Sequence, residues 1–159
     1  MSMGHGYASN GVRAPVHVGF PPLPSMDRFV QGGPFPIGDR TGRRGIVLVA
    51  DDEPHIVDLL ALLLEDEGYI VLRAYDGEQA WDLALQARPD LVISDVMMPR
   101  LGGPGLFRRL RGTRGFDRTP VILMSAVPSS ATEKGAQFIA KPFDIERVVD
   151  LVAAELAAA

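Results

Sequence analysis

The chain has 159 residues, of which 47% are hydrophobic, and it carries a formal net charge of −4. This length and composition are enough for one sizeable hydrophobic core, while the absence of cysteine excludes disulfide bonds and zinc sites built on thiolates. The longest apolar run after residue 44, Leu59 to Leu64, is far too short to cross a membrane, and the first residues lack the continuous apolar segment of a secretory signal. We therefore expect a cytoplasmic protein that has no contact with a membrane.

The first 44 residues differ in composition from the rest of the chain. They are rich in Gly and Pro and show no helical or strand periodicity, and such a segment buries too little apolar surface to offset its ordering entropy. We predict a disordered tail over residues 1–44 and one folded domain over residues 45–159. The domain holds 11 basic and 18 acidic side chains, which disfavours direct binding to nucleic acid, and we interpret the arginine-rich stretch 108–118 as an exposed helix face.

The first predicted elements are a strand over residues 46–50 and the helix that follows it. The strand sequence is apolar throughout, which is typical of a strand buried on both faces of a parallel sheet. Pro54 suits the first position of the helix and Gly68 suits the residue after its end. The spacing i, i+3, i+4, i+7 predicts the residues that this helix buries, which are Ile56, Leu59, Leu60 and Leu63.

The alternation of strand and helix continues to the end of the chain. Asp76, with Gln79 three residues later, resembles a capping box that opens a second helix. Pro104 opens a third helix, and Asp144 caps the last one. The remaining strands are predicted at residues 69–74, 91–94, 121–124 and 138–140. This alternation predicts an α/β fold, with a parallel sheet covered by helices on both faces.

Polar residues stand where the predicted strands end. In an open parallel sheet the carboxyl ends of the strands meet along one edge, so these residues should share one cleft. Carboxylates that converge there repel one another unless a cation lies among them, and Mg²⁺ is the ion that fits oxygen ligands best. The residues at the strand ends are Asp51, Asp52, Asp95, Ser125 and Lys141.

Four segments of the sequence resemble the receiver domain of bacterial two-component response regulators. They are VADDEP (49–54), LVISDVMMP (91–99), VILMSA (121–126) and FIAKPF (138–143). The resemblance extends from residue 45 to about residue 157 and implies a flavodoxin-like, doubly wound, five-stranded parallel sheet with strand order 2-1-3-4-5.

The resemblance also implies a role for each residue of the cleft. Asp95 would accept a phosphoryl group from a sensor histidine kinase or a histidine phosphotransfer protein. Asp52 and Asp95 would bind Mg²⁺ directly, Asp51 would bind it through water, and Met97 would contribute its backbone carbonyl. Lys141 and Ser125 would bind the phosphoryl oxygens. Phe138 would act with Ser125 in switching, and the Lys141–Pro142 bond would be cis.

Two departures from the family pattern bear on function. Only 16 positions separate Ser125 from Lys141, so the helix between the fourth and fifth strands should be reduced to about a turn or lost. Met97 and Val127 are apolar where the family often has polar residues beside the attacking water, which predicts slow self-dephosphorylation.

The sequence therefore predicts a stand-alone receiver that controls an unidentified downstream protein as a monomer or weak dimer. It would catalyse only its own phosphorylation and dephosphorylation and would not otherwise be an enzyme. One alternative is a pseudo-receiver, a protein-interaction scaffold of the same fold that is not phosphorylated. A phosphohydrolase with an aspartate nucleophile would usually have a second Asp where this chain has Met97.

Overall fold

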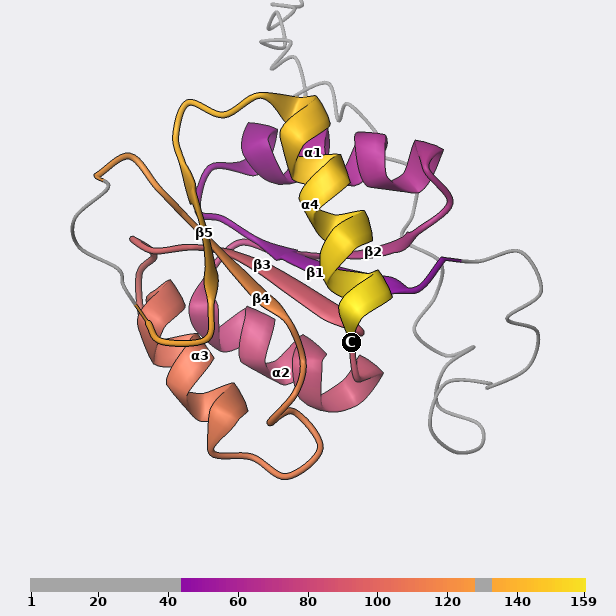
Figure 1. The fold of residues 1–159 in the computed structure, drawn as a ribbon. Coiled ribbons are helices and arrows are strands. Elements are labelled where there is room, and N and C mark those ends of the chain that lie inside the picture. The colour runs from indigo at the N-terminus through magenta and orange to yellow at the C-terminus, as the bar shows by residue number, and fades with distance from the viewer. Residues whose placement is uncertain (1–43, 128–132) are drawn as a thin grey trace, which may run out of the picture. The chain divides into compact units, whose positions relative to one another are not determined.

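The computed structural model describes residues 44–127 and 133–159, so the predicted tail lies, except for Arg44, outside the described residues. Strands and helices alternate from Ile46 to Ser125, and β5 then follows β4 without a helix among the described residues before α4 ends the fold (Figure 1). In chain order the elements are β1 (Ile46–Ala50), α1 (Pro54–Asp66), β2 (Ile70–Ala74), α2 (Gly77–Ala87), β3 (Leu91–Asp95), α3 (Gly103–Arg111), β4 (Val121–Ser125), β5 (Gln137–Ala140) and α4 (Ile145–Ala158).

The five strands form one sheet in which every pair of neighbours is parallel. Their order is β2-β1-β3-β4-β5, which confirms the predicted topology. Figure 1 shows α1 and α4 on one face of the sheet and α2 and α3 on the other. The central strands β1, β3 and β4 are almost entirely buried, because helices cover both of their faces.

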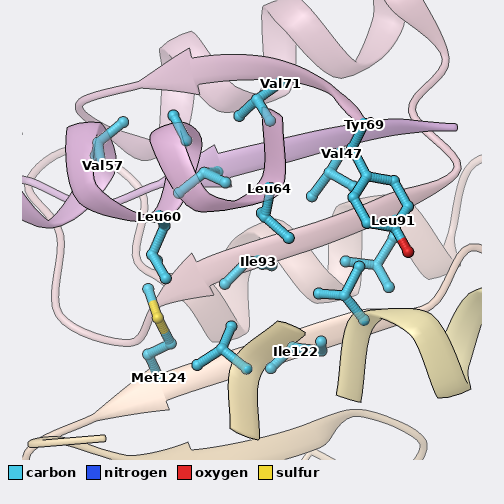
Figure 2. Close-up of a cluster of buried hydrophobic side chains, with 14 of the residues drawn as sticks. Val47, Val57, Leu60, Leu64, Tyr69, Val71, Leu91, Ile93, Ile122 and Met124 are labelled. Atoms are coloured by element: carbon cyan, nitrogen blue, oxygen red, sulfur yellow. The ribbon is translucent and has the colours of Figure 1, made fainter. Parts of the chain in front are cut away.

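The core between the sheet and the helices α1 and α4 corrects the predicted buried face of α1. Figure 2 shows Val57, Leu60 and Leu64 directed toward the side chains of the sheet, whereas Leu59 is 39% exposed. The buried face therefore lies one residue further along the chain than predicted. The prediction was wrong because α1 is apolar at nearly every position from 56 to 64, so more than one set of residues satisfies the helical spacing.

The other face of the sheet packs against α2 and α3 as the sequence predicts. The Asp76 carboxylate accepts a hydrogen bond of 2.9 Å from the Gln79 N–H and caps α2. Leu106, Phe107 and Leu110 of α3 are buried in this second core cluster. α2 therefore begins directly after its predicted cap, and α3 begins at Gly103, one residue before the predicted first position at Pro104.

The connection from β4 to β5 is short. Residues 126–127 and 133–136, the described part of this connection, form turns and loops without a helix, which confirms the predicted loss of a full helix here. Its far end is fastened to α3: Arg108 pairs with Glu133 at 2.6 Å, and Arg111 donates a hydrogen bond of 3.4 Å to the Gly135 carbonyl. No helix in the described part of the chain is both long and apolar enough to span a membrane.

Candidate functional site

The predicted site residues lie together at the carboxyl edge of the sheet. The register pairs Ala50 with Ser94 and Asp95 with Met124 across β1, β3 and β4, so the residues that follow these strands emerge side by side. On the next strand Ser125 pairs with Ala140, and the Lys141 N–H donates a hydrogen bond of 2.7 Å to the Ser125 carbonyl. The predicted convergence on one edge is confirmed.

Lys141 is the centre of the site's ion pairs. Its Nζ lies 2.6 Å from Asp51 Oδ2 and 2.9 Å from Asp95 Oδ1, and it also lies 3.7 Å from Glu53 Oε1. The Lys141 side chain is 15% exposed, while those of Asp51 and Asp95 are 0% and 8% exposed. One ammonium group therefore joins the ends of β1, β3 and β5 in a region with little access to water.

Three carboxylates gather beside this lysine. One oxygen each of Asp51, Asp52 and Asp95 lies within 4.8 Å of the other two, and Asp52 is the exposed member. Ligands on opposite sides of a magnesium ion are about 4.2 Å apart, because each oxygen lies about 2.1 Å from the metal. These residues therefore fit a small divalent cation in spacing and in chemistry, and the exposed side leaves room for water ligands.

Backbone N–H groups hold the two buried carboxylates in place. Asp51 Oδ1 accepts a hydrogen bond of 3.0 Å from the Glu53 N–H, and Asp95 Oδ2 accepts one of 3.0 Å from the Met97 N–H. Each of these aspartates thus uses one oxygen for the backbone and the other for Lys141. Their orientation is fixed by the same strand ends that bring them together.

The electrostatics of the site favour a further positive charge. Burial raises the pKa of Asp95, and although the hydrogen bond from Lys141 opposes this effect, the charge of Asp51 adds to it. Burial lowers the pKa of Lys141, but its hydrogen bonds with Asp51 and Asp95 outweigh burial and raise the pKa overall. At neutral pH the lysine is therefore charged, while the ionised form of Asp95 is less favourable than an exposed carboxylate.

Ser125 is buried, and its hydroxyl bonds to its own loop. Its Oγ donates a hydrogen bond of 3.1 Å to the Val127 carbonyl and accepts one of 3.0 Å from the Val127 N–H. The hydroxyl is therefore engaged two residues along the chain, although Ser125 stands at the strand end that the sequence indicates.

The other predicted site residues flank the cleft. Phe138 lies on β5, is half-buried against the α2–α3 side of the core, and lines a hollow of about 370 Å³ with Pro142, Phe143 and Arg147. The Met97 side chain is exposed, and the residue is 74% accessible. The Lys141–Pro142 peptide bond is cis, as the resemblance implies.

One acidic contact of Lys141 was not predicted from the sequence. Glu53 follows the aspartate pair directly and reaches within 3.7 Å of Nζ, so three carboxylates, those of Asp51, Glu53 and Asp95, pair with the one ammonium group. The position of Glu53 directly after Asp51 and Asp52 could have suggested this contact. Which of the three adjacent acids faces inward, however, depends on how the chain turns into α1.

Comparison with known proteins agrees with this geometry. The sequence profile described as "Response regulator receiver domain" matches residues 47–153. The chain is 44% identical over 116 residues to response regulator GtcR of Aneurinibacillus migulanus, an alignment that covers 69% of this chain and 47% of that protein. The chain thus spans about half the length of the curated relatives it matches.

Comparison with solved structures also finds receiver domains. The receiver domain of the Francisella response regulator 1452 superposes with a TM-score of 0.66 at 31% identity, covering 72% of this chain and 98% of that one. The receiver domain of sensor histidine kinase PA1611 from Pseudomonas aeruginosa, solved with a magnesium ion coordinated in its active-site cleft, has a TM-score of 0.65 at 24% identity and covers 71% and 98%, so it shows the shared fold alone. From its matched sequence, its strand order and the cleft at its strand ends, this chain belongs to the response regulator receiver domain family of two-component systems.

Proposed function

We propose that this chain is a cytoplasmic phosphorelay switch in which Asp95 accepts a phosphoryl group from a phosphohistidine. The donor would be a sensor histidine kinase or a histidine phosphotransfer protein. A carboxylate oxygen of Asp95 would form a bond to phosphorus while the nitrogen–phosphorus bond of the donor breaks and the imidazole leaves. The observation that carries this proposal is the contact of Lys141 with Asp95 within the carboxylate cluster.

Lys141 and Ser125 would stabilise the transferring group. In phosphoryl transfer, charge spreads over the equatorial oxygens, so catalysis consists mainly of placement and neutralisation. Lys141 Nζ already lies 2.9 Å from the Asp95 carboxylate and would bind one of these oxygens with little movement. The Ser125 hydroxyl would donate to another after it leaves Val127.

The carboxylates would hold Mg²⁺ in this reaction. Asp52 and Asp95 would bind it directly and Asp51 through water, and the Met97 carbonyl would be a further ligand. When bound, the ion would neutralise both the carboxylates and the incoming phosphoryl oxygens. The spacing of the three carboxylates supports this assignment, and so does the magnesium ion in the cleft of the PA1611 receiver domain, which has the same fold.

Phosphorylation would change the surface that a downstream protein recognises. The phosphoryl group adds negative charge and acceptor oxygens beside Ser125, and movement of Ser125 would draw its loop toward Asp95. Phe138, which has no hydroxyl and is half-buried, would respond through burial of its ring. The chain would act on no other substrate and would catalyse only its own phosphorylation and dephosphorylation.

A pseudo-receiver scaffold is the second candidate, and one observation favours it. The described residues between β4 and β5 contain no helix, so a surface that could respond to phosphorylation is reduced. A scaffold of this kind would bind its partner without accepting phosphate.

Acetyl phosphate with Mg²⁺ distinguishes the two candidates. We expect intact-protein mass spectrometry to show the gain of one phosphoryl group, which should be absent with EDTA and absent in Asp95→Asn. Asp82→Asn, which changes an exposed carboxyl on α2, is the matched control and should be phosphorylated like the parent. If the parent protein gains no mass under these conditions, and its spectrum does not change when beryllofluoride is added, the chain is a pseudo-receiver scaffold instead.

A further inference from the structure

The loop that follows Asp95, residues 96–102, closes back on the strand from which it leaves. The Met97 N–H donates to Asp95 Oδ2 at 3.0 Å, and the Gly103 N–H donates to the Val96 carbonyl at 3.1 Å. A Cβ atom at Gly103 would lie only 2.5 Å from the Asp95 carbonyl oxygen. The position of the Met97 backbone therefore depends on how this loop is held.

Arg100 gives the loop a strained turn. Its φ is +67°, and the Leu101 N–H donates to the Pro99 carbonyl at 2.8 Å, so Arg100 is the central residue of a γ-turn with positive φ, a rare and strained form. Gly would adopt this φ without the steric cost that an arginine incurs. Such a conformation persists only where the surroundings impose it.

The side chain of Arg100 makes one of the contacts that hold this residue at positive φ. Its guanidinium donates to Oδ2 of Asp76, while Oδ1 of Asp76 accepts from the Gln79 N–H and caps α2. The Asp76 side chain is only 9% exposed, and the hydrogen bond from Arg100 is the main cause that lowers its pKa. The loop is thus tied to a buried carboxylate that is itself fixed to the start of a helix.

Leu101 provides the second contact. A Cβ atom at Gly77 would lie 1.7 Å from the Leu101 carbonyl oxygen, and one at Gly105 would lie 2.6 Å from Leu101 Cδ1. Leu101 therefore sits between the first turns of α2 and α3, in space that exists because both neighbours are glycine. The ion pair and this packing act on adjacent residues of one short loop.

We infer that Arg100 is a positioning residue for the metal site. Its ion pair with Asp76 fixes the loop 96–102, and through the loop it fixes the Met97 backbone in the arrangement that binds Mg²⁺ beside Asp95. The inference deepens the proposed function and rests on it, since it concerns the same metal site. Among the contacts of the described residues, Arg100 pairs with Asp76, and none joins it to the carboxylate cluster or to the reacting atoms.

Titration of the full chain with MgCl₂, followed by calorimetry, tests this inference. Arg100→Gln should bind Mg²⁺ about tenfold more weakly, which is the lower end of the cost of losing an outer partner of a metal site. Electrostatics alone predicts the opposite, because removing a positive charge near a cation site favours the cation. Arg109→Gln is the matched control: it breaks a different ion pair, between Arg109 of α3 and Glu78 of α2 at 2.9 Å, and should leave the affinity unchanged.

Three further single variants separate positioning from general stability. Arg100→Gly should fold at least as stably as the parent, because it relieves the φ strain, yet it should bind Mg²⁺ as weakly as Arg100→Gln. Asp76→Asn keeps the helix cap and breaks the ion pair, so it should weaken binding, and combining it with Arg100→Gln should weaken binding no further. Arg100→Lys, which keeps the charge, should recover part of the affinity.

Hydrogen exchange gives a readout that does not depend on activity. The Met97 and Leu101 amides should exchange faster in Arg100→Gln than in the parent, and at the parent rate in Arg109→Gln. Unchanged or tighter Mg²⁺ binding by Arg100→Gln, or equal weakening in Arg109→Gln, would overturn the inference alone. A parent that takes up no Mg²⁺ would overturn the metal-dependent proposed function and this inference with it.

Discussion

Replacing the phosphoacceptor by its neutral isostere, Asp95→Asn, should stabilise the fold when Mg²⁺ is absent. At an effective dielectric constant of about 20, each of the two other carboxylates, which lie no more than 4.8 Å away, repels Asp95 by at least about 3.5 kcal/mol, and attraction to the Lys141 ammonium 2.9 Å away is about 6 kcal/mol. Burial also disfavours the ionised form of Asp95, and the net effect of burial and of these charges raises its pKa. Removing the charge should therefore raise the free energy of unfolding, by about 0.5–2 kcal/mol for a functional-site substitution of this kind.

The effect of pH on this difference follows from the direction of the pKa shift. A carboxyl whose pKa is higher in the folded state than its ordinary value of 3.8 binds a proton more tightly when folded. Its ionisation therefore destabilises the fold fully above the folded-state pKa, and this cost vanishes below the unfolded-state pKa. The advantage of Asp95→Asn should be largest at neutral pH and should disappear as the pH falls below about 4.

Urea unfolding in EDTA, followed by circular dichroism from neutral to acidic pH, measures this difference. Asp82→Asn, on the exposed surface of α2, should stay within about 0.5 kcal/mol of the parent. Adding Mg²⁺ at 100 times its dissociation constant should stabilise the parent by about 2.7 kcal/mol and reduce or reverse the advantage of the variant. A variant less stable than the parent in EDTA, or a difference that does not shrink in acid, would refute the reasoning.

Three further predictions test other parts of the structure. Met97→Asn places an amide, which can hydrogen-bond the attacking water, at an exposed position two residues after Asp95 and should shorten the lifetime of the phosphorylated protein. An unchanged half-life would contradict the proposed role of an apolar residue there. Gly77→Ala should destabilise the fold by about 2 kcal/mol or more, measured by urea midpoint, because its Cβ would lie 1.7 Å from the Leu101 carbonyl oxygen. Leu60→Ala should lower the free energy of unfolding by about 2–5 kcal/mol, because Leu60 is 1% exposed. Leu62→Ala should lower it by less than about 0.5 kcal/mol, because Leu62 is 65% exposed. Equal losses in the two variants would contradict the buried face of α1.

The sequence was sufficient to predict the features that depend on local chemistry. Strands buried on both faces are apolar throughout, and helix starts carry Pro54, Asp76 and Asp144, so five strands and four helices could be placed from the residues alone. The site followed because strand order brings the ends of parallel strands to one edge. Asp95 and Lys141 are 46 positions apart in the sequence, yet their contact was implied by topology.

What could not be predicted depends on side-chain packing between elements. In α1 several apolar faces compete, and only the volume available against β1 and β2 decides that Leu60 is buried and Leu59 is not. The pairing of Arg100 with Asp76 joins two loops and has no sequence signal. The interpretation of residues 108–118 as an exposed face was also incomplete, because Arg111 is half-buried and donates to the carbonyls of Phe116 and Thr119 at 3.1 and 2.8 Å.

Under the proposed function, the free energy of switching depends on hydrogen bonds that Ser125 makes at the start of the connection from β4 to β5. To reach a phosphoryl oxygen on Asp95, Ser125 must give up its two hydrogen bonds with Val127, each of which contributes about 1 kcal/mol. A hydrogen bond to a charged oxygen contributes about 1.5–3 kcal/mol, so the exchange is nearly balanced. A small gain at the phosphoryl group would therefore be enough to shift the population between two states, as a reversible switch requires.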